Sequence, residues 1–231
     1  MTETQRRIAA EAWAFRTRVE REAADRFTRR LATTISRFDA ASPLPAMMQR
    51  AVEDEQRHAA LCAGLAAIYG TAATGLAKDV PIAPRSLERR AAVLYEVVAA
   101  CCITETESVA TLTTLLAEEV EPAVEKVLRA IAGDEVAHGR MGWAHLAREA
   151  ARYDVSFLSS WIPAMLSGTV EETVFPEAPS DDRDLLRHGV LPPARKRAIF
   201  ARTLEEVVMP GLEKFGIDGA PARAWLSARI R

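Results

Sequence analysis

Cysteine is scarce in this chain of 231 residues, and none of its cysteines is spaced as a CxxC pair. The three that it has are Cys62, Cys101 and Cys102. An odd number without a regular framework argues against a disulfide scaffold and for a reducing compartment. We therefore predict a cytoplasmic protein whose thiols are free.

Long apolar runs and a strong charge of one sign are also missing. The most apolar stretch, residues 91–103, is shorter than a membrane span and contains Glu96. The first residues show no apolar segment followed by a small-residue cleavage site, as a signal peptide would. The formal net charge is −2 at pH 7, so no general attraction to nucleic acid is expected. We predict neither a membrane nor a nucleic-acid partner.

The alternating β-branched patterns of strands are absent, and helical periodicity runs through nearly the whole chain. Thr2 and Gln5 fit a capping box, Ser86 fits an N-cap, and Pro122 suits the first turn of a helix. The pattern predicts four long helices, over residues 2–38, 46–69, 86–117 and 122–152. Two further helices are predicted, over residues 155–172 and 192–214. A Pro- and Asp-rich loop, residues 175–184, separates these two.

The connections between the first four helices differ in length. The first, residues 39–45, and the third, residues 118–121, are short, whereas residues 70–85 form a long connection. A helix of about 22 residues is roughly 33 Å long, and about 16 extended residues can span that length. One long crossover is typical of a ferritin-like four-helix bundle. We predict an all-α fold, with this bundle over residues 1–152 and a helical extension over residues 153–231 that packs on it.

Two segments share the pattern DExxH, DEQRH at residues 54–58 and DEVAH at residues 134–138. Glu55 and His58 are three residues apart and therefore share one helix face. Glu135 and His138 repeat that spacing, and apolar residues recur on both faces. Two such segments arise by accident in roughly one of ten thousand chains of this composition. We interpret them as two pairs of inward-facing metal ligands.

A dinuclear site in such a bundle takes one more carboxylate from each of the other two helices. On the first helix, Glu20 lies on the apolar stripe, whereas Glu22 falls on the arginine-rich, solvated face. On the third helix, Glu105 is in phase with the more apolar stripe and Glu107 with a less apolar one. We choose Glu20 and Glu105 as ligands. We expect Glu22 and Glu107 to be solvated or to contact a ligand.

Four buried carboxylates repel one another strongly unless cations neutralise them, and two divalent ions would balance four glutamates. Carboxylate and imidazole ligands suit iron or manganese better than metals that prefer thiolates. Asp54 and Asp134 directly precede the two motif glutamates. We expect each aspartate to accept a hydrogen bond from a ligand histidine, across to the opposite helix.

Other residues near the motifs are less specific. His145 follows His138 by about 10 Å along the helix axis, too far for a ligand, so a core or channel position is expected. His188, in the segment RHGV, is expected at the surface. The glycines around the second motif either permit close helix packing or leave room for a substrate. They are Gly133, Gly139 and Gly142.

Residues 10–150 resemble the ferritin-like di-iron carboxylate superfamily, through the pattern E…DExxH…E…DExxH. That superfamily includes rubrerythrins, the radical-generating subunit of ribonucleotide reductase, aldehyde-deformylating oxygenases, and di-iron N-oxygenases and hydroxylases. The resemblance implies two iron ions, with manganese or a mixed pair as alternatives, and activation of dioxygen or peroxide. It implies no catalytic residue beyond the metal ligands. The implied ligands are Glu20, Glu55, His58, Glu105, Glu135 and His138.

Three functions stay open at this point. The first is a di-iron oxidase or oxygenase for a small organic substrate, and the apolar residues of 153–231 favour it because they could wall a pocket. The second is a rubrerythrin-like ferroxidase or peroxidase, although the chain lacks a CxxC…CxxC module and an acidic iron-loading run. The third is a non-enzymatic helical scaffold with a structural metal site. An electron donor protein and a homodimer are further partners that we consider.

Overall fold

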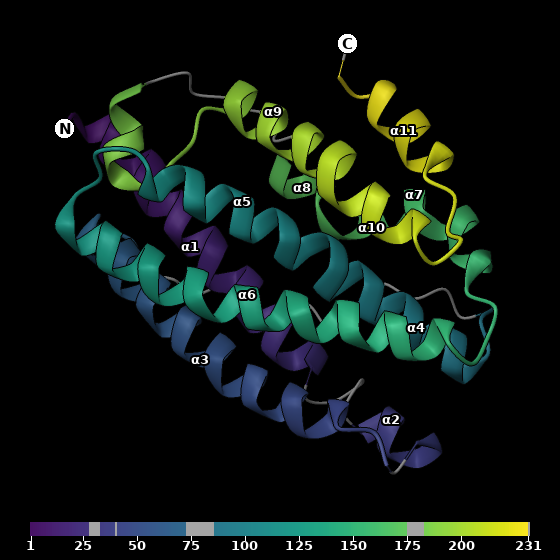
Figure 1. Cartoon of the computed structure of the whole chain (residues 1–231). Helices are drawn as coiled ribbons and strands as arrows, with labels where there is room; N and C mark the ends of the chain where they lie inside the picture. Colours follow the sequence, from purple (N-terminus) through teal and green to yellow (C-terminus); the bar gives the residue numbers. More distant parts are fainter. Residues whose placement is uncertain (28–32, 40, 73–85, 175–182, 231) are drawn as a thin grey trace. The chain divides into compact units, whose positions relative to one another are not determined.

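The computed structural model describes residues 1–27, 33–39, 41–72, 86–174 and 183–230. Throughout these residues the chain forms helices, turns and bends, without a strand (Figure 1). The predicted all-α class is confirmed for them, whereas the ferritin-like bundle stays a prediction. None of the described helices has both the length and the apolar composition that crossing a membrane requires.

The chain folds as two compact units, each assembled from separate stretches of sequence. Unit 1 contains Met1–Val80, Leu112–Asp134 and Ser180–Pro192. Unit 2 contains Pro81–Thr111, Glu135–Pro179 and Pro193–Arg231. The boundary predicted at residue 152 divides the chain only once, whereas these units alternate along it. The division into a bundle and an extension stays a prediction.

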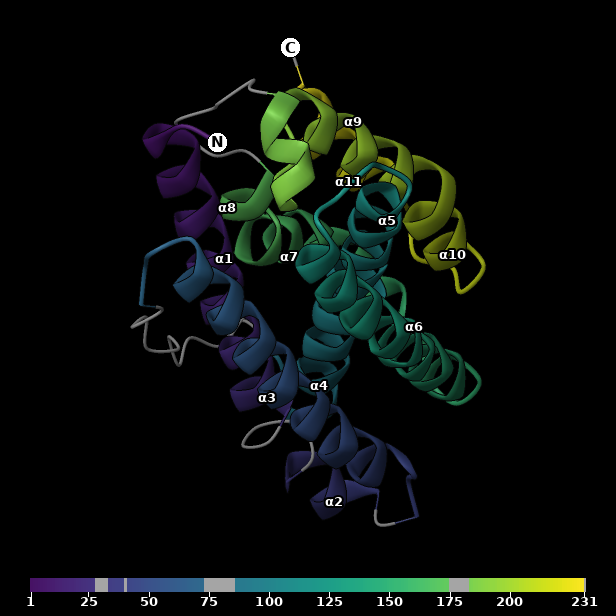
Figure 2. The same ribbon diagram turned by 90° about the vertical axis from the view of Figure 1, so that its left-hand side faces the viewer.

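Two long helices form the frame of unit 1. α1 spans Glu3–Asp25 and α3 spans Leu44–Ile68, and they lie side by side in opposite directions (Figures 1 and 2). The predicted capping box is present, because Gln5 N donates to Thr2 Oγ1 at 3.2 Å and Thr2 N donates to Gln5 Oε1 at 2.6 Å. Both helices bury apolar side chains, which hold them together. Among these side chains are Trp13, Ala24, Met48, Val52 and Leu65.

The predicted first helix corresponds to two elements, α1 and the short α2, Thr33–Phe38. Residues 28–32, between them, lie outside the described part of the chain. The predicted turn follows α2, and there Ser42 Oγ accepts a hydrogen bond from Leu44 N at 3.3 Å. The long crossover predicted over residues 70–85 falls mostly outside the described residues, which stop at residue 72 and resume at residue 86.

A short segment from late in the chain completes unit 1, beginning with η4, Arg183–His188. Trp13 Nε1 donates to the backbone oxygen of His188 at 2.9 Å, and Tyr69 Oη lies 3.1 Å from His188 Nδ1. Gly189 has a φ of +77°, and a Cβ there would lie 2.6 Å from the Trp13 ring, so this close turn requires glycine. His188 is therefore half-buried, not at the surface as predicted, because the segment folds back against α1 and Tyr69.

A continuous helix with a π-helical segment enters unit 2. It consists of α4, Arg89–Val97, η2, Val98–Thr104, and α5, Glu105–Leu116. Its N-cap is Glu88 and not Ser86 as predicted, because Glu88 has extended backbone angles and its side chain accepts from Ala91 N at 3.2 Å. α6 spans Pro122–Ala150 and starts at the predicted proline. Its residues up to Asp134 belong to unit 1 and those from Glu135 to unit 2.

The C-terminal residues of unit 2 form short helices near the predicted positions. The first group is η3, Ser156–Trp161, α7, Ile162–Thr169, and α8, Glu171–Val174. The second group is α9, Pro193–Thr203, η5, Leu204–Val208, and α10, Met209–Glu213. The last helix, α11, Ala220–Ser227, is not predicted, although proline in its first turn is a helix-start signal. Most of the predicted loop over 175–184 lies outside the described residues.

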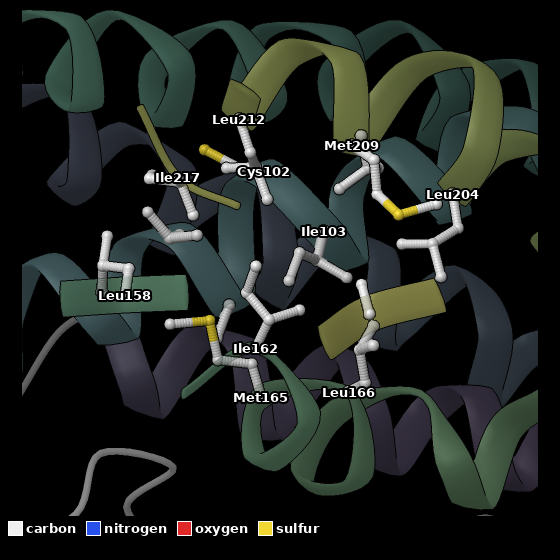
Figure 3. Packing of buried hydrophobic residues seen from close by; sticks show 14 of the residues in the cluster. Cys102, Ile103, Leu158, Ile162, Met165, Leu166, Leu204, Met209, Leu212 and Ile217 are labelled. Atoms are coloured by element: carbon white, nitrogen blue, oxygen red, sulfur yellow. The ribbon is translucent and has the colours of Figure 1, made fainter. Parts of the chain in front are cut away.

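A large apolar cluster forms the core of unit 2 (Figure 3). The π-helical segment η2 contributes Cys102 and Ile103, and the short helices pack their apolar faces against it. Burying such a side chain stabilises the fold by about 1.5–3 kcal/mol. The labelled partners in Figure 3 include Leu158, Ile162, Met165, Leu166, Leu204, Met209, Leu212 and Ile217. The C-terminal residues therefore form an integral part of this unit.

Candidate metal centre

Six predicted ligands gather in two groups of three, one in each unit. In unit 1, ligand atoms of Glu20, Glu55 and His58 lie within 4.8 Å of one another. In unit 2, ligand atoms of Glu105, Glu135 and His138 satisfy the same distance. Each group therefore offers two carboxylates and one imidazole, a donor set that could hold a metal ion.

All six side chains are buried. In unit 1 the exposed fractions of Glu20, Glu55 and His58 are 6%, 1% and 0%. In unit 2, Glu105, Glu135 and His138 are buried to a similar degree. Burying a carboxylate costs several kcal/mol unless a cation or a set of hydrogen bonds compensates it. The burial of these six residues is therefore the feature that most needs a chemical explanation.

In unit 1, His58 lies between carboxylates on both of its ring nitrogens. His58 Nδ1 lies 3.7 Å from Glu20 Oε2 and 3.5 Å from Glu55 Oε2, longer than good hydrogen bonds. Donor atoms that share one ion at roughly 2.1 Å lie roughly 3 to 3.6 Å from each other. The three donors are therefore spaced about as widely as ligands of one ion.

The other ring nitrogen of His58, Nε2, contacts Asp134, as the sequence predicts. His58 Nε2 lies 2.9 Å from Asp134 Oδ2, and Arg57 Nη2 donates to the same oxygen at 2.7 Å. Arg57 also donates to Asp54 Oδ1, one turn earlier on α3, at 2.8 Å. Asp134 and Arg57 thus fix the ring orientation of His58. The predicted hydrogen bond between Asp54 and a ligand histidine stays a prediction.

These contacts shift the pKa values of the pair. Burial lowers the pKa of His58, but Glu20, Glu55 and Asp134 outweigh burial and raise it to about 11. Burial raises the pKa of Asp134, but the hydrogen bonds from His58 and Arg57 outweigh burial and lower it. Without a metal ion, a proton on His58 thus offsets part of the negative charge in this group.

In unit 2, Glu135 connects the group to a residue that sequence reasoning missed. His138 Nδ1 lies 3.2 Å from Glu135 Oε2, and Ser108 Oγ donates to Glu135 Oε1 at 3.4 Å. Ser108 lies on α5, one turn after Glu105, and could have been found from that spacing. A serine in a helix is too common to be singled out without the neighbouring ligand.

The alternatives to Glu20 and Glu105 are placed differently from the predicted ligands. Glu107 is buried, not solvated, and accepts a hydrogen bond from the buried Thr111 Oγ1 at 2.7 Å. Glu22 is half-buried and pairs with Arg18 on its own helix at 3.0 Å. Among the described residues, neither belongs to a group spaced for a metal ion.

Close packing in unit 2 brings Glu105 beside the second motif. A Cβ on Gly142 of α6 would lie 2.3 Å from Cys101 Cβ in η2, so only glycine fits there. A Cβ on Gly139 would make an ordinary contact of 3.9 Å with Glu105 Cβ. Gly133 has open space instead. Of the two alternatives for these glycines, close helix packing or room for a substrate, Gly142 fits close helix packing.

The π-helical segment η2 ends directly before Glu105. Within it, Thr104 Oγ1 donates to Ala99 O at 2.9 Å, which satisfies a carbonyl in the widened turn. Single π-helical turns are rare and occur often at functional sites. His145 is buried, as predicted, and all three cysteines are buried and free of disulfides.

Comparisons with known proteins leave the chain without an assigned relative. No protein-family model matches it, and neither a curated protein nor a solved structure does.

Proposed function

We propose that the protein is a di-iron oxidase or oxygenase, with the six ligands forming one dinuclear centre in a ferritin-like four-helix bundle. The observation that carries this proposal is the matched pair of buried groups, each with two glutamates and one histidine. Two equivalent donor sets suit two ions, and the donors suit iron, with manganese or a mixed pair as alternatives.

The chain itself supports a single centre. Glu135 directly follows Asp134 in α6, and Asp134 is the hydrogen-bond partner of His58. The unit 1 group and the unit 2 group are therefore linked through one hydrogen bond and one peptide bond. The four helices of the proposed bundle would be α1, α3, the continuous helix α4–η2–α5, and α6.

Charge supports two divalent ions. Glu20, Glu55, Glu105 and Glu135 together carry up to four negative charges when ionised. Two divalent cations balance them, which removes the cost of burying four carboxylates. Two iron ions in this setting supply the redox chemistry that activates dioxygen or peroxide.

The residues around the centre would orient and shield it. Asp134 holds His58 by its outer nitrogen, and Arg57 holds Asp134 in turn. Ser108 holds one oxygen of Glu135, leaving the other toward His138. The near-complete burial of the six side chains excludes bulk water, which strengthens the electrostatic interactions inside.

The apolar core of unit 2 favours an organic substrate over iron or peroxide alone. A ferroxidase needs little beyond its four helices, whereas here the described residues of 155–174 and 199–226 build an apolar core together with η2. An oxygenase of this kind also consumes electrons, so an electron donor protein is a proposed partner.

A matched pair of glutamate variants tests the centre. Full-length protein is freed of metal, loaded with ferrous iron without oxygen, and analysed for bound metal. We expect about two ions per chain in the wild type and in Glu107→Gln, and about one or none in Glu105→Gln. Equal metal content in both variants would contradict the ligand assignment. Two ions without oxygen consumption would favour the structural scaffold.

The function is tested separately from the metal content. Oxygen consumption by the iron-loaded protein is measured with a reductant, in the presence and absence of candidate organic substrates. We expect consumption that depends on the substrate and is lost in His58→Ala and His138→Ala. Consumption that depends only on added ferrous iron or peroxide would favour the ferroxidase or peroxidase.

A further inference from the structure

Tyr95 is fully buried, and its hydroxyl lacks a hydrogen-bond partner in the part of the chain that the structure describes. Its side chain is 0% exposed, and Tyr95 Oη has no hydrogen-bond partner among the residues that the structure describes. A buried hydroxyl left unpaired costs about 1–3 kcal/mol. Such a group is expected to have a reason, because the great majority of buried polar groups are paired.

The side chains around Tyr95 are mostly apolar, and the buried Glu96 is the charged group that acts on it. The residue belongs to the unit 2 cluster and makes an edge-to-face contact with Trp161, at 6.3 Å between ring centroids. A buried water needs about two to four polar partners, and an apolar cluster does not supply them. Burial, followed by the charge of Glu96, raises the pKa of Tyr95 to about 12, so the hydroxyl keeps its proton and stays a donor.

Tyr95 is connected to the candidate centre by its own helix. Glu105 lies ten residues later in the continuous helix α4–η2–α5, which is roughly 15 Å along the axis. Cys102 and Ile103 lie between them in η2 and face the apolar side chains of α7 and α10 (Figure 3). Apolar side chains of unit 2 therefore pack against the helix between Tyr95 and Glu105.

Trp161 sits at the edge of this cluster. It is half-buried, at the end of the short η3, and packs against the cluster together with the half-buried Phe157. A short 3₁₀ helix has poorer hydrogen bonds than an α-helix and opens at lower cost. A ligand that reaches Tyr95 would enter by displacing Trp161 and Phe157 of η3.

We propose that the apolar cluster of unit 2 binds a largely apolar molecule with a single hydroxyl or carbonyl group, and that Tyr95 Oη donates to that group. Binding of such a molecule at Tyr95 does not depend on the metal centre. Its identity as the substrate of the oxygenase rests on the proposed function.

The test uses octanol and octane with the metal-free, full-length protein, so that a failure of the metal assignment does not affect it. Binding is measured by calorimetry for the wild type, Tyr95→Phe and Tyr153→Phe. Tyr153 is exposed and serves as the matched control. We expect the wild type and Tyr153→Phe to prefer octanol, and Tyr95→Phe to lose about tenfold of that preference. Octane should bind Tyr95→Phe at least as well as the wild type.

Two further measurements keep the proposal falsifiable. Urea unfolding of the ligand-free protein should show Tyr95→Phe to be as stable as the wild type or more so, because an unpaired hydroxyl has been removed. The chain has only three tyrosines, so the ring-carbon NMR signal of Tyr95 can be followed on addition of octanol, and we expect it to shift. Absence of octanol binding, an unchanged preference in Tyr95→Phe, or a destabilised Tyr95→Phe would overturn the proposal.

Discussion

His188 links two distant parts of unit 1, and burial shifts its titration. Burial is the largest effect on its pKa and lowers it below 6.5, with the N-terminal charge and Arg187 acting in the same direction and Glu121 opposing them. Well above pH 6.5 the histidine is neutral in both the folded and the unfolded state. As the pH falls below that value, the unfolded state binds the proton more readily, so stability is lost.

Replacement of this histidine should therefore change the pH dependence of unfolding. Between about pH 7.5 and about pH 5, we expect the free energy of unfolding of the wild type to change less favourably than that of His188→Asn. The raised pKa of His58 stabilises the fold over part of this range, but it acts equally in both proteins. Urea titrations at the two pH values measure both differences. Carboxylates titrate in both proteins, so the difference between them isolates the histidine. An equal change in the two proteins would mean that His188 is not held as a buried neutral ring.

At the residue scale, sequence spacing predicted contacts between residues of one helix, but not contacts between residues far apart in the sequence. Glu55 with His58, and Glu135 with His138, follow from a three-residue spacing, and each pair belongs to one group in the structure. The partner of His188 is Tyr69, 119 residues away, and no local pattern points to it. Short-range geometry is fixed by the helix, whereas long-range contacts depend on packing.

At the scale of elements, two of the three glycines of α6, Gly133 and Gly142, should respond in opposite ways to alanine. Gly142 has no room for a Cβ, so Gly142→Ala should destabilise the protein by about 1–3 kcal/mol through overpacking against Cys101. Gly133 is exposed, has open space, and lies inside the same helix. Gly133→Ala should stabilise the protein by up to about 1 kcal/mol, since alanine is the better helix former.

Urea unfolding of the two variants beside the wild type checks this prediction. Because both substitutions add the same methyl group to one helix, propensity contributes equally to both. No destabilisation by Gly142→Ala would mean that η2 and α6 approach each other less closely than Gly142 and Cys101 indicate. Destabilisation by Gly133→Ala would mean that a side chain at this exposed position is not free of contacts.

The π-helical segment could not be predicted from the periodicity. Residues 93–103 are buried without interruption, and the charged Glu96 among them is buried too, so no exposed position marks the phase of the helix there. Glu105 was chosen over Glu107 from a regular phase, yet both side chains are buried. The choice agrees with the grouping of Glu105 beside Glu135 and His138, although the phase alone did not separate the two glutamates.

At the scale of the whole molecule, the units alternate along the chain, and α5 and α6 pass from one to the other without a break. A helix melts cooperatively, so we expect the two halves of α6 to unfold together. We expect a single unfolding transition. Trp13 lies in unit 1, and the other three tryptophans, Trp143, Trp161 and Trp225, lie in unit 2.

Fluorescence can therefore report on each unit separately. A variant that keeps only Trp13 reports on unit 1, and Trp13→Phe reports on unit 2. We expect the signal of each variant to follow the same urea midpoint as its own far-ultraviolet circular dichroism. Two separated midpoints within one variant would show that the units unfold independently.

The rough limits of the long helices α3 and α6 were predictable, because caps, prolines and apolar periodicity are local signals. The alternation of the two units was not, since it depends on which apolar faces meet across long sequence separations. α11 was also missed, because a helix of eight residues offers little periodicity to detect. Trp225 and Leu226 nevertheless place this helix in the core of unit 2.

The passage of α6 from unit 1 to unit 2 gives the second motif an unusual constraint. Its first residue, Asp134, contacts His58 of α3. Its glutamate and histidine, Glu135 and His138, belong to the ligand group in unit 2. One residue inserted between Asp134 and Glu135 would rotate everything that follows by about 100° and advance it by about 1.5 Å. Insertions and deletions during evolution should therefore be tolerated in the turns, but not between Asp134 and Glu135.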